Sequence, residues 1–378
     1  MIEKITSLEK VLTHLKHIYV GKDQIIDLLG LSLIAGENIF LYGPPGTAKS
    51  AIVKSLSKQI ENGKNFDYLL TKFTEPNEIF GPINIQKLRE GELVTNIENM
   101  LPEASIVFLD ELFNANSAIL NSLLTSLNEK TFRKGKETFN LPTLMFISAS
   151  NHLPDEEALE ALFDRFVVRV KCDYVEPALL IDVLTKGRNL QKNTLEDKPT
   201  ITIEDIVELQ SFTRTLDTSP IHQQYSNVVK NLRNAGISIS DRRAVKLLNL
   251  IASSAILSHR DYVIDSDLWV LKHIWDNEEE IEILESVIDE FLNHLPTNDL
   301  SHSQALQNHL PNPEELHNQL KKLVEEWNND EINLEQKNNV KDKLRILQSR
   351  IQWLKNQEKK EYIQQEIDKL WSQILISI

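Results

Sequence analysis

Several features that define protein classes are scarce or absent in this chain of 378 residues. Its single cysteine, Cys172, excludes an internal disulfide and a zinc site built from cysteines. Apolar runs such as 141–147 end well before the ~20 residues that a membrane-spanning helix needs, and the N-terminus lacks the apolar segment of a secretory signal. We therefore expect a cytoplasmic protein without a transmembrane segment.

Positive charge is also in short supply. The chain has 41 Lys and Arg against 56 Asp and Glu, which gives a formal net charge of −15. Because DNA is a polyanion, this balance argues against nucleic acid as a partner, although a local basic patch is compatible with it. Residues 276–378 hold 11 Lys and Arg against 21 Asp and Glu, and this shift in charge predicts a boundary near residue 276.

Residues 1–175 alternate between apolar strands and helical patterns. The predicted strands cover 38–42, 66–72, 105–110, 143–148 and 166–172. Between two of them, 117–128 has apolar residues at helical spacing. Strands separated by helices predict βαβ units, and hence an α/β fold with a parallel sheet.

Two stretches are predicted to form hairpins, one at 83–97 with its turn at 89–92 and a shorter one at 131–139 around Gly135. Residues 176–275 lose the strand pattern and are predicted to be helical. Within them, Ser240 or Asp241 is a plausible N-cap for a helix that begins there.

The acidic tail predicts three helices, of which the first covers 276–295. Apolar residues in the other two alternate four and three apart, as in heptads. They are Leu316, Leu320, Leu323 and Trp327, then Val340, Leu344, Leu347, Ile351 and Leu354, with Ile363, Ile367, Leu370 and Ile374 resuming the pattern after a charged gap. Because the heptad breaks, we expect a helical bundle or hairpin and not a long coiled-coil rod.

The strongest local signal is Gly43–Ser50, with the sequence GPPGTAKS, between a predicted strand and a predicted helix. Such a loop turns backbone N–H groups toward phosphates, and the helix dipole adds positive potential. Lys49 is expected to reach the β- and γ-phosphates, and the Ser50 hydroxyl to bind Mg²⁺. Ala48 stands where the general pattern has glycine, but its methyl group is small. The residues expected to bind ATP or ADP are Pro45, Gly46, Thr47, Ala48, Lys49, Ser50 and Ala51.

Asp110 and Glu111 end the apolar strand at 105–110. Ligands of open parallel sheets bind at this carboxyl edge. Asp110 is expected in the Mg²⁺ shell, and Glu111 is expected to orient and polarise the attacking water. Alone the pair could be a solvated acidic turn, but together with the phosphate loop it predicts a catalytic site.

Three further polar positions fit the same chemistry. Asn151 follows another apolar strand, where its amide can position water near the γ-phosphate. Arg165 could neutralise transition-state charge within its own chain or across an interface, unless it only pairs with Asp164. Arg242 or Arg243 could contact phosphate from the helical region.

In this order and spacing, these residues resemble an AAA+ module. Gly43–Ser50 resembles the Walker A motif, and Asp110-Glu111 resembles the Walker B motif. Asn151 is at the position of sensor 1, Arg165 at that of the arginine finger, and Ser240–Arg242 at that of sensor 2. The phrases GPPGTAKS, TKFTEPNEIFGP, LPEASIVFLDE, ILNSLLTSLNE and ALFDRF resemble the MoxR family, closest to its RavA branch, over about residues 5–290. In that family an alanine at position 48 is normal, and the two predicted hairpins match its helix-2 insert and pre-sensor-1 hairpin.

The resemblance implies an ATPase core at 1–190, an all-helical lid at 191–275 and a triple-helical domain at 276–378. It also implies adenine contacts from Tyr19 and Val20, and a catalytic role for Arg242.

The implied activity is Mg²⁺-dependent hydrolysis of ATP to ADP and phosphate in a chaperone-like remodeller. The resemblance further implies a homo-oligomer, a hexameric ring in which Arg165 completes the pocket of the neighbouring subunit. It implies a partner with a von Willebrand factor A (VWA) domain as well.

Two rival functions are compatible with the same residues. A DNA-acting AAA+ motor would use the basic residues of the two hairpins, which are Lys87, Arg89, Arg133, Lys134 and Lys136. A nucleotide-switched scaffold would bind ATP with little turnover, so that Glu111→Gln would leave its function intact. The complete set of Asp110, Glu111, Asn151 and Arg165 argues against the scaffold.

Overall fold

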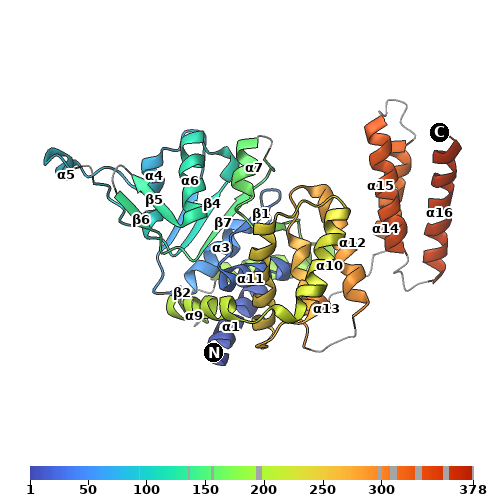
Figure 1. Ribbon diagram of the computed structural model, residues 1–378, viewed down its shortest axis with the longest axis horizontal. Coiled ribbons are helices and arrows are strands. Elements are labelled where there is room, and N and C mark those ends of the chain that lie inside the picture. The colour runs from blue at the N-terminus through green and yellow to red at the C-terminus, as the bar shows by residue number, and fades with distance from the viewer. Residues whose placement is uncertain are drawn as a thin grey trace.

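The fold is given by a computed structural model. It describes residues 1–92, 94–134, 137–154, 157–192, 198–295, 300–306, 313–327, 334–351 and 357–376. Figure 1 shows the sheet with its helices at one side of the molecule, a group of helices in the middle, and the bundle of α14, α15 and α16 at the opposite end.

A five-stranded parallel sheet forms the centre of the first region, as the sequence predicts. Its order is β3-β4-β7-β1-β8. The strands are β1 (Ile39–Tyr42), β3 (Asn65–Leu69), β4 (Ile106–Asp110), β7 (Met145–Ser150) and β8 (Val168–Lys171). β7 is buried along its whole length, because helices cover parallel sheets on both faces. All five strands point the same way, so the loops at their carboxyl ends share one edge of the sheet.

The helices of this region supply the covering layers. They are α1 (Ile2–Ile18), α2 (Asp23–Ala35), α3 (Lys49–Lys58), α4 (Pro76–Phe80), α5 (Ile85–Arg89), α6 (Ser117–Glu129) and α7 (Glu157–Phe163). α6 confirms the helix predicted over 117–128. α2 contacts α1, α9 and α11, and most of its residues are buried, which fits its apolar sequence.

Of the two predicted hairpins, the structure supports the second and supports the first only in part. β5 (Thr131–Lys134) and β6 (Glu137–Asn140) pair antiparallel, while Gly135 lies outside the described residues. In the first, residues 82–84 and 94–96 pair antiparallel through the Ile83–Thr95 bridge and two backbone hydrogen bonds of 2.8 Å. The rest of the predicted first strand is wrong, because α5 occupies its place. The Asn84 side chain explains this, since it accepts the N–H groups of Gln86 and Lys87 at 3.1 and 3.2 Å and so caps a helix.

The second region is helical, as predicted. Its elements are α8 (Leu180–Lys192), α9 (Ile203–Thr215), α10 (His222–Asn234), α11 (Asp241–Leu257), the 3-10 helix η5 (Asp265–His273), α12 (Glu278–Asn293) and α13 (Ser303–Leu306). A short parallel pair, β2 (Ile60–Glu61) with β9 (Ile201–Thr202), joins it to the first region. Ser240 is the N-cap of α11, because its hydroxyl accepts the N–H of Arg243 at 3.2 Å.

The acidic helix of the predicted tail contacts α15, but it does not share the hydrophobic cluster of the other tail helices. α12 buries Leu284, Ile288 and Leu292 in the main hydrophobic cluster, which continues to Ala305. The change at residue 276 is therefore one of charge, and the packing changes later in the chain. The division into three domains at 190 and 275 stays a prediction.

The last three helices have a hydrophobic cluster of their own. They are α14 (Pro313–Trp327), α15 (Leu334–Ile351) and α16 (Gln357–Ile376), and α14 contacts both others. The predicted heptad residues fill this cluster from Leu316 to Ile374, apart from Leu354, which lies outside the described residues. α15 and α16 are separate helices that pack against each other, so the tail holds more helices than the three that the sequence predicts. Among the described residues, no helix is long and apolar enough to cross a membrane.

Candidate functional site

The loop between β1 and α3 has a backbone that depends on small residues. At Gly43 (φ 152°) a Cβ atom would lie 2.3 Å from the carbonyl oxygen of Cys172, so any side chain there would separate β1 from β8. Gly46 has φ 83°, and Ala48, which caps α3, has φ 69°. Ala48 thus occupies the left-handed region that glycine favours, and its small side chain limits the strain.

The structure brings the loop and the end of β4 together. The Ser50 hydroxyl donates a 2.7 Å hydrogen bond to Oδ2 of Asp110. The Lys49 ammonium is buried and donates to the carbonyl oxygens of Gly43 and Pro44 at 2.6 and 2.9 Å. A hydroxyl, a carboxylate and an ammonium therefore lie within one turn of the start of α3, beside its unpaired N–H groups.

Glu111 directly follows β4 in the left-handed conformation, with φ 54°. Its N–H donates to Oδ1 of Asp110 at 3.1 Å, and its carboxylate accepts a long 3.4 Å contact from Asn114. The unusual φ is a local cost of the kind that recurs at functional sites, and here it occurs at the residue expected to orient water.

Asn151 is the first residue after β7, and β7 lies between β4 and β1 in the sheet. Its side chain is exposed and its Oδ1 contacts Nδ1 of His152 at 2.9 Å. The topology therefore places Asn151 at the same edge as the phosphate loop and Asp110. His152, which sequence analysis did not single out, is a second polar group there.

A cavity of about 200 Å³ opens beside the phosphate loop. Tyr19 and Val20, the two positions expected to contact adenine, line it together with Gly46, Thr47 and Ala48. The Tyr19 hydroxyl donates to the carbonyl of Ala51 at 3.0 Å, which ties the cavity wall to α3. Sequence analysis missed the opposite wall, formed by Tyr174, Val175 and Val183 from the segment after β8, because their pattern is that of ordinary helix and loop residues.

Two buried groups near the loop are structural. Lys22 donates to the carbonyl of Asp173 at 2.5 Å, and burial lowers the pKa of its ammonium group. Burial also raises the pKa of the Cys172 thiol to about 12. A thiol with this pKa stays protonated at neutral pH, so Cys172 is a core residue.

Arg165 lies just after α7, and its described contacts are within its own chain. Its Nη1 pairs with Oδ2 of Asp164 at 2.9 Å, and its carbonyl accepts from Asn38 at 3.1 Å. The side chain is 23% exposed. The ion pair that the sequence left as the alternative is therefore present, and a role across an interface stays a prediction.

The two candidate arginines of the helical region differ in their surroundings. Arg243 is buried and pairs with Asp276 at 3.0 Å, whereas Arg242 is exposed at the first turn of α11. Arg243 is thus part of the packing between the two regions. The expected phosphate contact of Arg242 stays a prediction.

Two family descriptions match successive parts of the chain. The MoxR domain in the MoxR-vWA-beta-propeller ternary systems matches residues 6–211. An AAA lid domain matches residues 215–288, which includes most of α12.

Individual relatives support the same grouping. The uncharacterized protein MJ0812 of Methanocaldococcus jannaschii is 34% identical over 276 residues, which cover 72% of each chain. The chaperone MoxR1 of Mycobacterium tuberculosis is 23% identical, covering 70% of this chain and 73% of the relative.

A crystal structure of a candidate ATPase from Cytophaga hutchinsonii has the same fold, with a TM-score of 0.61 at 19% identity, and covers 79% of this chain and 97% of that protein. The family match spans more than half of the sequence and agrees with both the strand order and the phosphate loop. This chain therefore belongs to the MoxR family of AAA+ ATPases.

Proposed function

We propose that this protein is a Mg²⁺-dependent ATPase that hydrolyses ATP to ADP and phosphate at the carboxyl edge of its sheet. The observation that supports this best is the 2.7 Å bond between Ser50 and Asp110, because it joins the phosphate loop to the acidic strand end. The cavity lined by Tyr19 and Val20 is also lined by Gly46, Thr47 and Ala48 of the phosphate loop and suits an adenine ring.

The residues present fit both parts of the ligand. Phosphate oxygens would take the place of the carbonyls that Lys49 now contacts, with N–H groups of the loop and of α3 as further donors. Ser50 and Asp110 offer the hard oxygen ligands that Mg²⁺ prefers. Among the described residues no cluster of three or more His, Cys, Asp or Glu could hold a metal, which fits a cation shared with phosphate oxygens. When bound, Mg²⁺ would neutralise charge on the phosphates.

The remaining polar residues have distinct roles in this proposal. Glu111 orients and polarises the attacking water, and Asn151 helps to hold it near the γ-phosphate. Arg165 of a neighbouring subunit stabilises the charge that develops on the transferred group, and Arg242 contacts phosphate from the lid. A shared site requires an oligomer, which we propose is a hexameric ring.

We further propose a chaperone-like remodeller that works in the cytoplasm with a VWA-domain partner. The chaperone MoxR1 and the family description that names vWA proteins support this role. The RavA branch stays a prediction from the sequence phrases. In this proposal, lid movement displaces α5 and the β5–β6 hairpin against a client protein, and the exposed Ile85 and Leu88 of α5 offer apolar contacts.

The basic residues of α5 and of the β5–β6 hairpin do not favour a DNA-acting motor. Lys87 pairs with Glu90 at 2.9 Å and lies 3.5 Å from Glu92, and Arg133 lies 3.5 Å from Glu129. These cations are therefore partly neutralised by nearby carboxylates, and the one beside Arg133 belongs to the last residue of α6. We expect no shift of single- or double-stranded DNA in a gel at low salt. Salt-sensitive binding of DNA would instead support the DNA-acting motor as the function.

The test is ATP hydrolysis per subunit over a range of protein concentrations, with Arg165→Ala in parallel. We expect specific activity to rise with concentration, and the variant to bind ATP but to be inactive at every concentration. Turnover that is independent of concentration and survives Arg165→Ala would contradict the shared site. Tight ATP binding with negligible turnover would favour the nucleotide-switched scaffold instead.

A further inference from the structure

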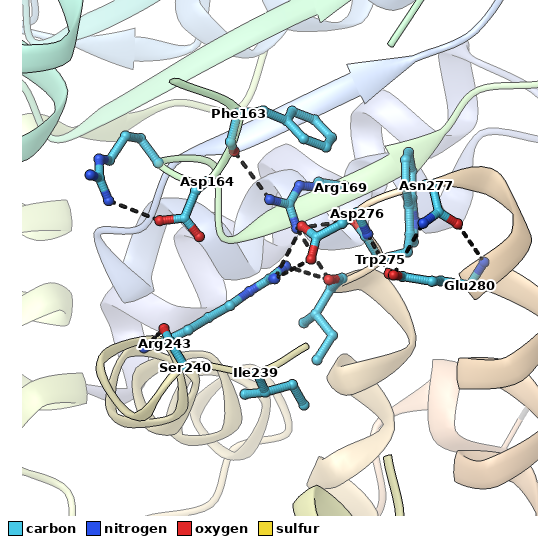
Figure 2. A network of polar contacts seen from close by, with 12 residues as sticks. Phe163, Asp164, Arg169, Ile239, Ser240, Arg243, Trp275, Asp276, Asn277 and Glu280 are labelled. Atoms are coloured by element: carbon cyan, nitrogen blue, oxygen red, sulfur yellow. Dashed lines mark hydrogen bonds and ion pairs between the residues drawn. The ribbon is translucent and has the colours of Figure 1, made fainter. Parts of the chain in front are cut away.

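Two arginines from different regions of the molecule share one carboxylate. Asp276 lies between η5 and α12, and its Oδ1 pairs with Nη1 of Arg169 from β8 at 2.8 Å. Its Oδ2 pairs with Nη1 of Arg243 from the first turn of α11 at 3.0 Å. Figure 2 shows the two guanidinium groups converging on Asp276. Asp276 thus connects the sheet to the helical region.

Arg169 also holds the segment that ends in Arg165. Its Nη2 donates to the carbonyl of Phe163, the last residue of α7, at 3.1 Å, and its guanidinium lies 4.1 Å from the centre of the Phe163 ring. Asp164 and Arg165 come immediately after Phe163 in the chain. Figure 2 shows Arg169 beside Phe163 and Asp164. A movement of Arg169 would therefore change the position of the backbone just before Arg165.

The charge balance makes Asp276 the critical member of this group. Arg169 is fully buried and Arg243 almost so, and both pair with Asp276. Burial and the nearby charge of Arg243 lower the pKa of Arg169 to about 9. Without the carboxylate, two buried like charges would repel one another. The lid would then be joined to Arg169 through the carbonyls of Ile274 and Trp275, which accept from its Nη1 at 3.1 and 2.9 Å.

The same short segment reaches the strand that leads into the phosphate loop. Glu278, two residues after Asp276, accepts from the Tyr42 hydroxyl at 2.5 Å and pairs with Lys171 at 2.8 Å. Tyr42 immediately precedes Gly43. Segment 276–278 therefore contacts the strand before the phosphate loop and, through Arg169, the turn that holds Arg165.

We propose that Asp276 is a positioning residue for Arg165, and that it makes the arginine offered to the next subunit depend on the position of the lid. The proposal rests on the proposed function, in which Arg165 acts in a neighbouring site. It assigns to the junction between η5 and α12 a role in communication between subunits. Asp276 itself does not touch nucleotide in this scheme.

Mixed rings test the proposal directly. Lys49→Ala subunits are expected to be inactive in their own site but to retain a normal Arg165. Asp276→Asn subunits are expected to retain their own ATP site but to present Arg165 poorly. In homogeneous rings we expect Asp276→Asn to lower kcat by about tenfold or more with KM for ATP changed less than about twofold, since small misplacement of a catalytic group costs up to ~10² in rate.

When Asp276→Asn is mixed with an excess of Lys49→Ala, we expect turnover per Asp276→Asn subunit to recover by about fivefold or more, because the neighbour then supplies a well-placed arginine. No recovery, with a raised KM, would overturn the proposal, because Asp276 would then act on its own site. Arg165→Ala mixed with Lys49→Ala serves as the reference. If that pair fails to recover, the shared site of the proposed function is wrong; if it recovers and the Asp276→Asn mixture does not, only this inference fails.

A second variant and a matched control separate positioning from folding. Arg169→Lys keeps a positive charge for Asp276 but cannot reach the Phe163 carbonyl through the same fork, so it should reproduce the fall in kcat and the recovery in mixed rings. Asp289→Asn removes another ion pair of the helical region, that with Lys272, without touching α7. It should leave kcat unchanged, and an equal loss of kcat in Asp289→Asn would also overturn the proposal.

Discussion

The carboxyl edge of the sheet and the C-terminal bundle of α14, α15 and α16 differ in the residues that form them. At the edge, Lys49 and Ser50 from the start of α3 lie close to Asp110 from the end of β4, and several residues have positive φ. In the bundle, buried apolar residues at heptad spacing form one cluster. Residues suited to chemistry add little to stability, whereas residues suited to packing add little to chemistry. Substitutions at the edge, in the bundle and between them test whether turnover and stability depend on separate sets of residues.

The largest effect is expected from Lys49→Ala and Glu111→Gln. Both should lower turnover by about 10³-fold or more, because each removes a group that acts on the phosphates or on the attacking water. Lys49→Ala should also lose ATP binding, whereas Glu111→Gln should retain it. Melting temperatures should change by less than about 3 °C. A large fall in melting temperature for either variant would show that the edge is also a structural element.

The reverse result is expected for Leu344→Ala in the bundle. This fully buried side chain should cost about 2–5 kcal/mol of the free energy of unfolding of the bundle, measured by denaturant titration. ATP turnover should be unchanged below the transition. Lys369→Ala, at an exposed ion pair with Glu366, is the matched control and should cost less than about 1 kcal/mol. Loss of turnover with Leu344→Ala would link the bundle to the active site.

Gly43→Ala is expected to lower both turnover and stability, because Gly43 belongs to the candidate site and also lies where β1 and β8 are in close contact. Its new Cβ would meet the carbonyl of Cys172 at 2.3 Å, so β1 and β8 must move apart at a cost of about 1–3 kcal/mol. Turnover should fall with stability. Gly187→Ala in α8 meets nothing within 4 Å and should raise stability by about 0.5–1 kcal/mol. Equal stabilities of the two variants would contradict the proposed clash.

The smallest expected effect is a loss of stability at acidic pH. It should occur in the region of the main hydrophobic cluster and not in the bundle. Burial lowers the pKa of His302, which stacks on Trp269 at 5.0 Å between ring centres. The unfolded state, with a histidine pKa of about 6.5, therefore binds the proton more readily. Stability of the main region is complete above that pH and should fall as pH drops through it. His302→Gln should flatten this dependence in melting curves from pH 8 to 5, while the bundle transition stays where it is.

The sequence predicts most of the edge because its signals are local. The phosphate loop, the acidic end of β4 and the polar end of β7 each come directly after a short apolar strand, and parallel strands bring such ends together. The cavity was predicted only on the side of Tyr19 and Val20. Its other wall contains Tyr174, Val175 and Val183, which follow Tyr19 and Val20 by more than 150 residues in the chain. No local sequence pattern relates these residues to the phosphate loop.

Where prediction failed or fell short, a competing local or distant contact decided the structure. The stretch from residue 83 is predicted to be the first strand of a hairpin, but the side chain of Asn84 caps a helix there. The charge change at residue 276 suggests a boundary, which stays a prediction, and the apolar face of α12 is buried in the main hydrophobic cluster. The pairing of Asp276 with Arg169 joins residues 107 positions apart in the chain, and such a pairing cannot be inferred from one sequence.

The late change of hydrophobic cluster has a consequence for how such chains diversify. The main cluster ends at Ala305 and the next begins at Leu316, so a C-terminal module could be exchanged between these points during evolution without uncovering either core. A fusion point at residue 276 would instead strip Leu284 and Ile288 from their partners and remove the carboxylate between two arginines. Recombination should therefore preserve α12 with the motor and vary the helices on its C-terminal side.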